Sequence, residues 1–144
     1  MKATELMIGD WVDFYHFYEP EKKIVTRHRV TDIYGSCLDG LVGISNHQNP
    51  VHADHIEPVK ITPEILEKNG FEVQDQGGGR RDVWIGFGVD CEGDIEVEFK
   101  YNVPVYLKID GGFKGEYYTS ANIKYIHQLQ HALRLCGIEK EIIM

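Results

Sequence analysis

The sequence predicts an α+β fold in three parts: an N-terminal SH3-like small β-barrel, a short connecting helix, and a C-terminal antiparallel β-meander covered by one helix. Three observations predict this fold. Short β-rich segments fill residues 1–60, a complete helix pattern occupies residues 61–71, and alternating strands followed by a helical pattern fill residues 72–144. We expect these ranges to be the structural units, with the two β-rich units sharing one core.

The first unit reads as a series of short strands separated by turn signals. Trp11–Tyr18 is dense in aromatic and β-branched residues, and Ile24–Tyr34 resumes that composition after a polar connection. Leu41–Ser45 and Val51–Ile56 each follow a turn or loop signal. Short strands with tight turns suit a small barrel, which hides its own edges, and an OB-like barrel is the alternative.

The segment Ile61–Phe71, I-T-P-E-I-L-E-K-N-G-F, predicts one short helix with a signal at each end. Thr62 is a favoured N-cap and Pro63 suits the first helical position, where its missing N–H does no harm. Asn69-Gly70 suits a left-handed C-cap. A helix of about two turns does not persist alone, so it must dock through its apolar residues. Those that we expect to be buried are Ile61, Ile65, Leu66 and Phe71.

The second unit begins with Glu72–Asp82, whose three successive glycines predict a mobile loop. The strands of the meander then follow as Val83–Val89, Ile95–Tyr101, Val103–Ile109 and Phe113–Thr119. Ile123–Cys136 repeats apolar residues at helical spacing, with Ser120 or Asn122 as its cap. The tail Ile138–Met144 predicts an edge strand or a segment that pairs with another copy of the chain.

Composition excludes several classes of protein. The formal charge is −8, and both halves are acidic, with 6 Lys/Arg against 9 Asp/Glu in residues 1–60 and 9 against 14 in residues 61–144. A dedicated duplex-binding protein needs cationic groups to neutralise phosphates, so this balance argues against one. We expect no membrane span and no signal peptide, and hence a cytoplasmic protein. Cys37, Cys91 and Cys136 have no C-x-x-C spacing and predict reduced thiols.

An aromatic and basic group in the first unit is the first candidate site. Tyr15 and Phe17 lie near Arg27 and Arg29 in the predicted hairpin, and Trp11 begins the same strand. Aromatic rings stack on bases and arginines neutralise phosphate, so this mixture is typical of single-strand nucleic-acid binders. The ordinary explanation, which we favour, is that these rings fill and cover a small barrel.

The histidines are the second candidate. His47, His52 and His55 lie within nine positions of one another and supply enough ligands for zinc. His52 and His55, however, differ by three positions in a predicted strand, which points them to opposite faces. We therefore treat them as weak metal candidates and expect no metal or other cofactor. His127 and His131 have a spacing that can hold a metal, but no third ligand is evident.

The strand around Trp84 is the third candidate. Gly86 and Gly88 share the Trp84 face of that strand and leave it bare, as in a shallow groove or at a close approach of another element. Glu96 and Glu98 share one face of the next strand. Alternating charges of this kind are typical of a solvated sheet face, which we favour over an acid–base pair.

Three blocks of the sequence resemble a known group of proteins. They are L-M-I-G-D-W-V at Leu6–Val12, the helix segment Ile61–Phe71, and I-K-Y-I-H-Q-L-Q-H-A-L at Ile123–Leu133. In this order they are similar to the recurring blocks of a family of short, uncharacterised proteins of gut-dwelling bacteria and their phages or mobile elements. The resemblance covers most of the chain. It implies an accessory role in that setting and transfers no catalytic or binding residue.

The function that the sequence favours is that of a non-enzymatic protein-interaction protein, because no catalytic set, ligand cluster or phosphate loop stands out. We expect its contact surfaces around Trp11 and Tyr15 and beside Trp84, and an unidentified protein or a second copy as partner. One alternative is a single-stranded nucleic-acid binder that uses Tyr15, Phe17, Arg27 and Arg29. The other is a metal-dependent hydrolase built on His47, His52 and His55.

Overall fold

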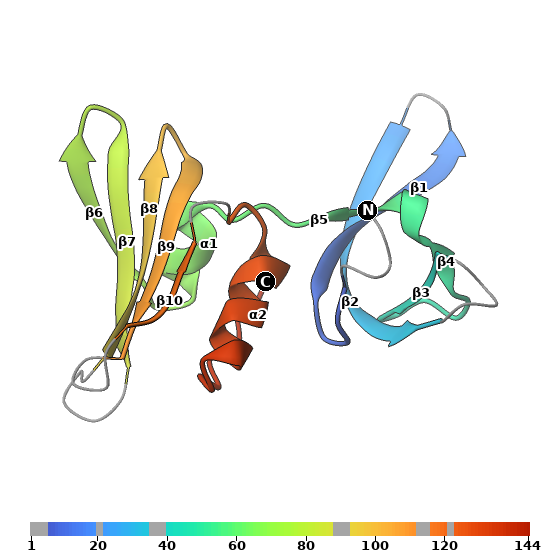
Figure 1. Cartoon of the computed structure of the whole chain (residues 1–144). Helices are drawn as coiled ribbons and strands as arrows, with labels where there is room; N and C mark the ends of the chain where they lie inside the picture. The colour runs from blue at the N-terminus through green and yellow to red at the C-terminus, as the bar shows by residue number, and fades with distance from the viewer. Residues whose placement is uncertain (1–5, 20–21, 35–39, 88–92, 112–115, 121–122) are drawn as a thin grey trace. The chain divides into compact units, whose positions relative to one another are not determined.

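The structure is a computed structural model that describes residues 6–19, 22–34, 40–87, 93–111, 116–120 and 123–144 (Figure 1). The chain has a mixed α+β fold, built mostly from two antiparallel sheets, with two α-helices in the described part. It divides into two compact units, Met1–Val59 and Lys60–Met144. Cys37 and Cys91 lie outside the described residues, whereas Cys136 is a free thiol. Among the described helices, none has the length and apolar character that a membrane crossing requires.

The first unit is a five-stranded antiparallel sheet with the strand order β4-β3-β2-β1-β5. Its strands are β1 (Trp11–Glu19), β2 (Lys22–Ile33), β3 (Leu41–Ile44), β4 (Val51–His52) and β5 (Ile56–Pro58). The alternation that predicts β1 also places its side chains: Val12 and Phe14 are buried, whereas Trp11, Asp13 and Tyr15 are only half-buried. The inward residues form one apolar cluster, Leu6, Val12, Phe14, Val30, Val42, Ile44, Val51, Ala53 and Ile56.

The predicted strand Val51–Ile56 is interrupted in the structure. A 3-10 turn, η2 (Ala53–His55), separates β4 from β5. The ring of His52 caps this turn, because its Nδ1 accepts a hydrogen bond from the backbone N–H of Asp54. A local side-chain bond of this kind competes with strand pairing, which explains why a β-type composition does not give one strand here.

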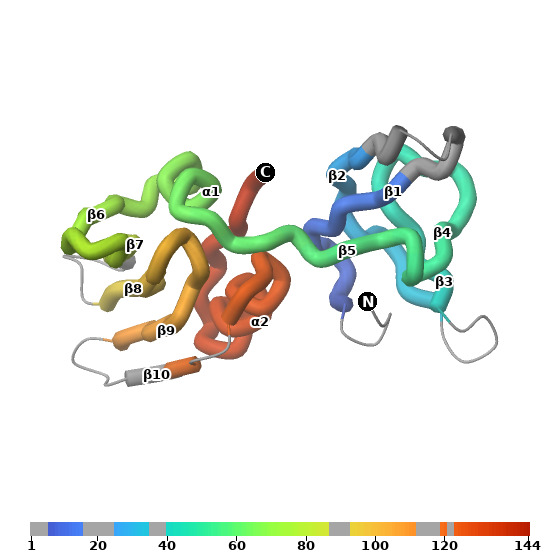
Figure 2. The backbone as a smooth tube through the Cα atoms, turned by 90° about the horizontal axis from the view of Figure 1, so that it is seen from above, coloured from blue at the N-terminus to red at the C-terminus, as the bar shows by residue number. Residues whose placement is uncertain are grey.

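The second unit is a five-stranded antiparallel meander with the order β10-β9-β8-β7-β6. Its strands are β6 (Glu72–Gly77), β7 (Arg80–Phe87), β8 (Gly93–Lys100), β9 (Val103–Asp110) and β10 (Glu116–Ser120). In β8 every second residue is buried, as its sequence predicts. Figure 2 shows these strands side by side, with both helices on one side of the sheet. One face of the sheet therefore packs against helices, and the other is left without a helix in the described part.

The prediction of a mobile loop at Glu72–Asp82 is wrong. Glu72–Gly77 forms the edge strand β6, which pairs with β7 from Glu72 opposite Trp84 to Gly77 opposite Arg80. The glycines make only the tight turn, where Gly77, Gly78 and Gly79 all adopt positive φ. The composition of β6 is poor in strand formers and every residue is exposed, so pairing with β7 holds it and local propensity does not.

The helix α1 (Pro63–Lys68) confirms its predicted caps. The Thr62 hydroxyl accepts a hydrogen bond from the Ile65 N–H at 3.3 Å. At the other end the Phe71 N–H donates to the Leu66 carbonyl at 3.1 Å, the bond that closes a Schellman motif. Ile61, Leu66 and Phe71 are buried as predicted, whereas Ile65 is only half-buried. The helix contacts β6 and β7 of its own unit.

The second helix, α2 (Ile126–Leu135), begins later than the sequence predicts. Its N-cap is Tyr125 and not Ser120, and the other predicted cap, Asn122, lies outside the described residues. The Gln128 side chain explains the shift: its Oε1 accepts hydrogen bonds from the backbone N–H groups of Lys124 at 2.8 Å and Tyr125 at 3.2 Å. This is the returning half of a capping box, made by the third residue of the helix.

The tail after α2 is not the predicted edge strand, because it adopts no regular secondary structure. Two side-chain amides hold it. Gln130 accepts from the buried N–H of Ile142 at 3.0 Å and donates to the Lys140 carbonyl at 2.9 Å. Asn69 exchanges two hydrogen bonds with the backbone of Ile143. Ile142 is fully buried, so the tail completes the core of the second unit.

Candidate functional site

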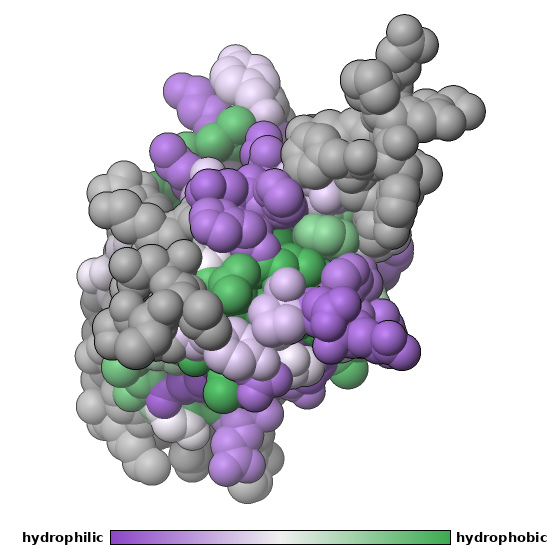
Figure 3. Space-filling view, turned by 90° about the vertical axis from the view of Figure 1, so that its right-hand side faces the viewer, coloured by the Kyte–Doolittle hydropathy of each residue, from purple (hydrophilic) through white to green (hydrophobic). Residues whose placement is uncertain are grey.

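Trp11 and Arg29 of the first unit lie opposite each other on β1 and β2. The Arg29 guanidinium stacks over the Trp11 ring, 4.6 Å from its centroid. The structure thus brings together two of the residues predicted for a binding surface. On the face shown in Figure 3, described hydrophobic residues form small groups between hydrophilic ones.

Carboxylates engage the other predicted residues of this group. Arg27 forms an ion pair with Asp13 at 2.8 Å, and the Tyr15 hydroxyl donates a hydrogen bond to Glu57. That bond, together with burial and the charge of Glu57, raises the pKa of Tyr15 to about 12. The side chain of Phe17 lies outside the described residues. The surface therefore carries both positive and negative groups, and the Arg27 guanidinium and the Tyr15 hydroxyl each contact a carboxylate.

The histidines named as metal candidates take separate roles. The His47 ring packs edge-on against Phe14, with ring centroids 5.3 Å apart, and its Nδ1 donates to the Asn49 carbonyl. His52 and His55 are not on opposite faces of a strand, because η2 turns the chain between them and brings their ring centroids to 6.3 Å. Even so, the described residues contain no group of three His, Cys, Asp or Glu side chains that could hold a metal ion.

The other described histidines make ring contacts or local hydrogen bonds within their own units. His28 is buried and bonded to the Thr26 hydroxyl and to the Ser45 carbonyl, whereas the side chain of His16 lies outside the described residues. On α2, the rings of His127 and His131 meet edge to face with centroids 5.6 Å apart. These contacts explain the rings by packing.

The outward face of the second sheet is organised around Trp84. Trp84 lies opposite Glu96 on β8 and opposite Glu72 on β6. Paired residues of antiparallel strands project from the same face, so two carboxylates flank the indole. Gly86, two positions along the same strand, adds no side chain beside it, and Trp84 itself is only half-buried. Strand alternation thus places Trp84 on a sheet face among acids.

Acids outnumber bases on this outward face. By register it carries the carboxylates of Glu72, Asp82, Asp94, Glu96, Glu98 and Asp110 and the cations of Arg80, Lys100 and Lys108. Arg80 lies 3.2 Å from Glu98 and 3.6 Å from Asp82, and Lys108 lies 2.8 Å from Asp110. Burial, reinforced by the charges of Asp82 and Asp94, raises the pKa of Glu96. The carboxylates on this face therefore repel one another.

Two of these carboxylates each have one buried oxygen atom without a hydrogen bond in the described part of the chain. Asp82 and Asp94 each bury one carboxylate oxygen that accepts no hydrogen bond from the described residues, although the Arg80 guanidinium lies 3.6 Å from that oxygen of Asp82. We refer below to Trp84 with these acids, Glu72, Asp82, Asp94, Glu96 and Glu98, as the Trp84 face.

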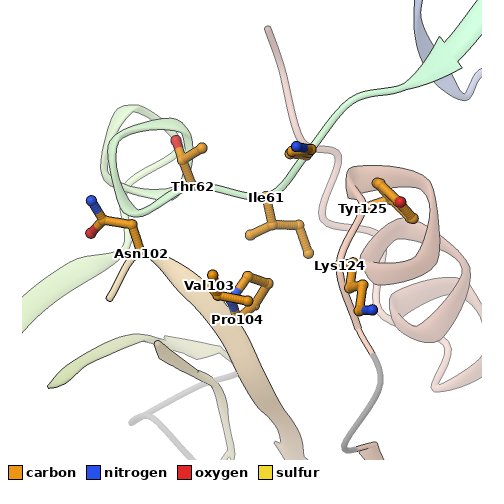
Figure 4. Close-up of a pocket in the computed structure, with 8 residues that line it drawn as sticks. Ile61, Thr62, Asn102, Val103, Pro104, Lys124 and Tyr125 are labelled. Carbon is orange, nitrogen blue, oxygen red and sulfur yellow. The ribbon is translucent and has the colours of Figure 1, made fainter. Parts of the chain in front are cut away.

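A pocket of about 300 Å³ opens elsewhere in the second unit. Figure 4 shows Ile61 at its middle, with Thr62 and Asn102 on one side and Lys124 and Tyr125 on the other. Val103 and Pro104 of β9 and Lys60 complete the lining. Sequence reasoning missed this site, because its residues come from three separate segments and only their pairing in space reveals it.

Lys60 and Tyr125 form an isolated antiparallel bridge, and the Ile61 N–H donates to the Lys124 carbonyl at 3.0 Å. These bonds join the start of the second unit to the start of α2 and fix the walls of the pocket. Comparison of the chain with protein-family models, with curated proteins and with solved structures finds no match.

Proposed function

We propose that this chain is a non-enzymatic protein-interaction protein and that the Trp84 face is its contact surface for a cationic segment of a partner protein. The observation that carries the proposal is the position of Trp84, half-buried on the sheet face that no described helix covers and flanked in register by Glu72 and Glu96. An indole binds a Lys or Arg side chain through its ring face, and adjacent carboxylates can pair with the same cation.

Charge supports a basic partner. Burial, and then the charges of Asp82 and Asp94, raise the pKa of Glu96, and an incoming cation would relieve the repulsion between these carboxylates. Arg80 contacts Asp82 and Glu98, and Lys108 contacts Asp110. A second copy of the chain that used the same face would bring like charges together, which favours a different protein over a homodimer through this surface.

The two alternative functions have weaker support in the described residues. For single-stranded nucleic acid, Arg27 and Tyr15 already contact Asp13 and Glu57, and these carboxylates repel phosphate. The stack of Arg29 on Trp11 is the one contact that favours it. A metal-dependent hydrolase would need His47, His52 and His55 to share one metal ion. His47 packs on Phe14, and the described residues contain no group of three side chains that could hold a metal ion.

We also propose that the first unit closes as an SH3-like small barrel. The edge strands β4 and β5 are joined by η2 alone, a turn of three residues. In a flat sheet of this order the two edges would lie roughly 19 Å apart, four spacings of about 4.8 Å. A 3-10 turn rises about 2 Å per residue and spans roughly 8 Å, so the connection supports a strongly curled sheet.

The resemblance of the three sequence blocks supports a biological setting for this role. We propose that the chain is an accessory protein of a bacterial phage or mobile element that binds a partner without catalysis. The cytoplasm is the compartment that we propose for it.

Fluorescence of Trp84 tests the proposed function. The sequence has two tryptophans, so Trp11→Phe leaves Trp84 as the only indole. We expect a short peptide of alternating lysine and serine to change this emission saturably at low ionic strength, and the matching glutamate peptide to leave it unchanged. Glu96→Gln should weaken the binding, whereas Glu139→Gln, the same charge change at an exposed position in the tail, should not. Equal weakening by both substitutions, or no response to the basic peptide, would refute the proposal.

A further inference from the structure

The pocket around Ile61 differs from the rest of this acidic chain in its charge. Among its eight lining residues, Lys60 and Lys124 are cationic and none is Asp or Glu. Both lysines are exposed, so their ammonium groups are available to a bound molecule. In a chain with 23 acids and 15 bases, a concave site lined in this way attracts an anion.

Apolar groups form the body of the same pocket. Ile61 and Pro104 are buried, and Val103 is 54% exposed beside them. Thr62, Asn102 and Tyr125 line the margins of this apolar part (Figure 4). Small-molecule sites combine an apolar lining with a few polar groups in this way, and about 300 Å³ is at the lower end of their usual volumes.

The backbone that carries the lysines is fixed. Lys60 is bridged to Tyr125, and the N–H groups of Lys124 and Tyr125 both donate to Gln128 Oε1. The pocket also adjoins the N-terminus of α2, whose partial positive charge adds to that of the lysines. Glu64 contacts the lining residue Thr62, and its pKa is lowered by its own backbone N–H and by the Thr62 hydroxyl. It lies 3.6 Å from Arg81, which offsets its charge.

We infer that this pocket binds a small organic anion. Lys60 and Lys124 supply the positive charge that attracts its carboxylate or phosphate group, and its apolar body lies on Ile61, Val103 and Pro104. The site shares no residue with the Trp84 face and takes a ligand of the opposite charge. It therefore adds a second binding activity that stands or falls independently of the proposed partner contact.

Three related probes test this inference: phenyl phosphate, benzoate and the neutral benzyl alcohol, each titrated into the full chain and followed by backbone amide NMR shifts. We expect at least one of the two anions to bind saturably, with shifts centred on Ile61, Asn102 and Tyr125, and benzyl alcohol to bind much more weakly. The anion that binds more tightly identifies the head group. Inorganic phosphate should bind less tightly than phenyl phosphate if the apolar surface contributes.

Charge substitutions provide the control. Lys60→Gln and Lys124→Gln should each weaken binding of the anion by roughly threefold to tenfold, because each removes one charged hydrogen-bond donor. Lys68→Gln removes the same charge from an exposed position at the end of α1, outside the pocket, and should leave the affinity unchanged. Failure of both anions to bind, shifts centred elsewhere, or equal effects of all three substitutions would overturn the inference.

Discussion

Trp84 of β7 and Glu96 of β8 lie directly opposite each other, so an indole and a carboxylate share the face of the second sheet that no described helix covers. The next outward neighbour of Glu96 is Lys108 on β9, whose ammonium is 2.8 Å from Asp110. This basic group is therefore shared between two acids, and the row across the sheet remains acidic. The arrangement combines the aromatic surface and the negative charge that recognise a basic side chain.

Glu96→Gln should stabilise the chain at neutral pH. The pKa of Glu96 is raised in the folded state, chiefly by burial and then by the charges of Asp82 and Asp94. The ionised carboxylate is thus less favourable in the folded chain than in the unfolded chain. The stability of the wild type relative to the variant therefore falls as pH rises through the folded pKa of Glu96. Urea unfolding should show a larger gain at neutral pH than at pH about 4. A gain that grows as pH falls would contradict the raised pKa.

The bond between Tyr15 and Glu57 should be visible in an alkaline titration. With its pKa raised to about 12, the Tyr15 phenol should ionise after an ordinary tyrosine. Its contribution to stability is complete below the unfolded pKa of about 10 and is lost as pH rises through the folded value. Phenolate absorbance of the wild type minus that of Tyr15→Phe isolates this group, and Glu57→Gln should lower its pKa. An ordinary pKa for Tyr15 in the wild type would contradict the hydrogen bond between Tyr15 and Glu57.

Gly79→Ala should destabilise the β6–β7 turn more than Gly78→Ala. Both glycines have positive φ, but a Cβ on Gly79 would lie 2.5 Å from the Tyr101 ring, whereas nothing lies within 4 Å of one on Gly78. We expect a loss of about 1 to 3 kcal/mol at Gly79, from backbone strain and the clash, and about 1 kcal/mol at Gly78. Chemical unfolding measures both. Equal losses would mean that Tyr101, which is 72% exposed, moves aside without cost.

Gln130→Ala should release the tail from the second unit. The substitution leaves the buried Ile142 N–H without its 3.0 Å acceptor, and we expect a loss of about 1 to 3 kcal/mol in the free energy of unfolding. Leu135→Ala, at a position of the same helix that is 79% exposed, is the control and should change stability by about 0.5 kcal/mol or less. Amide hydrogen exchange at Ile142 should accelerate in the first variant only. Unchanged exchange there would show that packing of the Ile142 side chain suffices.

Local signals made part of this structure predictable. The caps of α1 depend on residues within one turn of the chain, so Thr62 and the Leu66–Phe71 bond could be read directly. Alternation likewise assigned the inward residues of β8. It also placed Trp84 and Glu96 on the outward faces of their own strands.

The remainder depends on contacts that the sequence does not display. The edge strand β6 owes its form to pairing with β7, and η2 depends on a bond from the Asp54 N–H to His52. The start of α2 is set by the Gln128 side chain, which accepts hydrogen bonds from the Lys124 and Tyr125 N–H groups. Gln128 lies inside the helix, so a pattern of N-cap residues does not identify it. The pocket requires Lys60, Asn102 and Lys124 to meet, and no local pattern links positions so far apart in the chain.

The two indole N–H resonances provide the most direct test of the proposed partner contact. In a ¹H–¹⁵N correlation spectrum, Trp11 and Trp84 give separate signals that single Phe substitutions assign. On titration with the lysine–serine peptide, the Trp84 signal should shift saturably, together with the amides of Glu72 and Glu96, while the Trp11 signal stays in place. Shifts confined to Trp11, or an unmoved Trp84 signal at peptide saturation, would contradict the account.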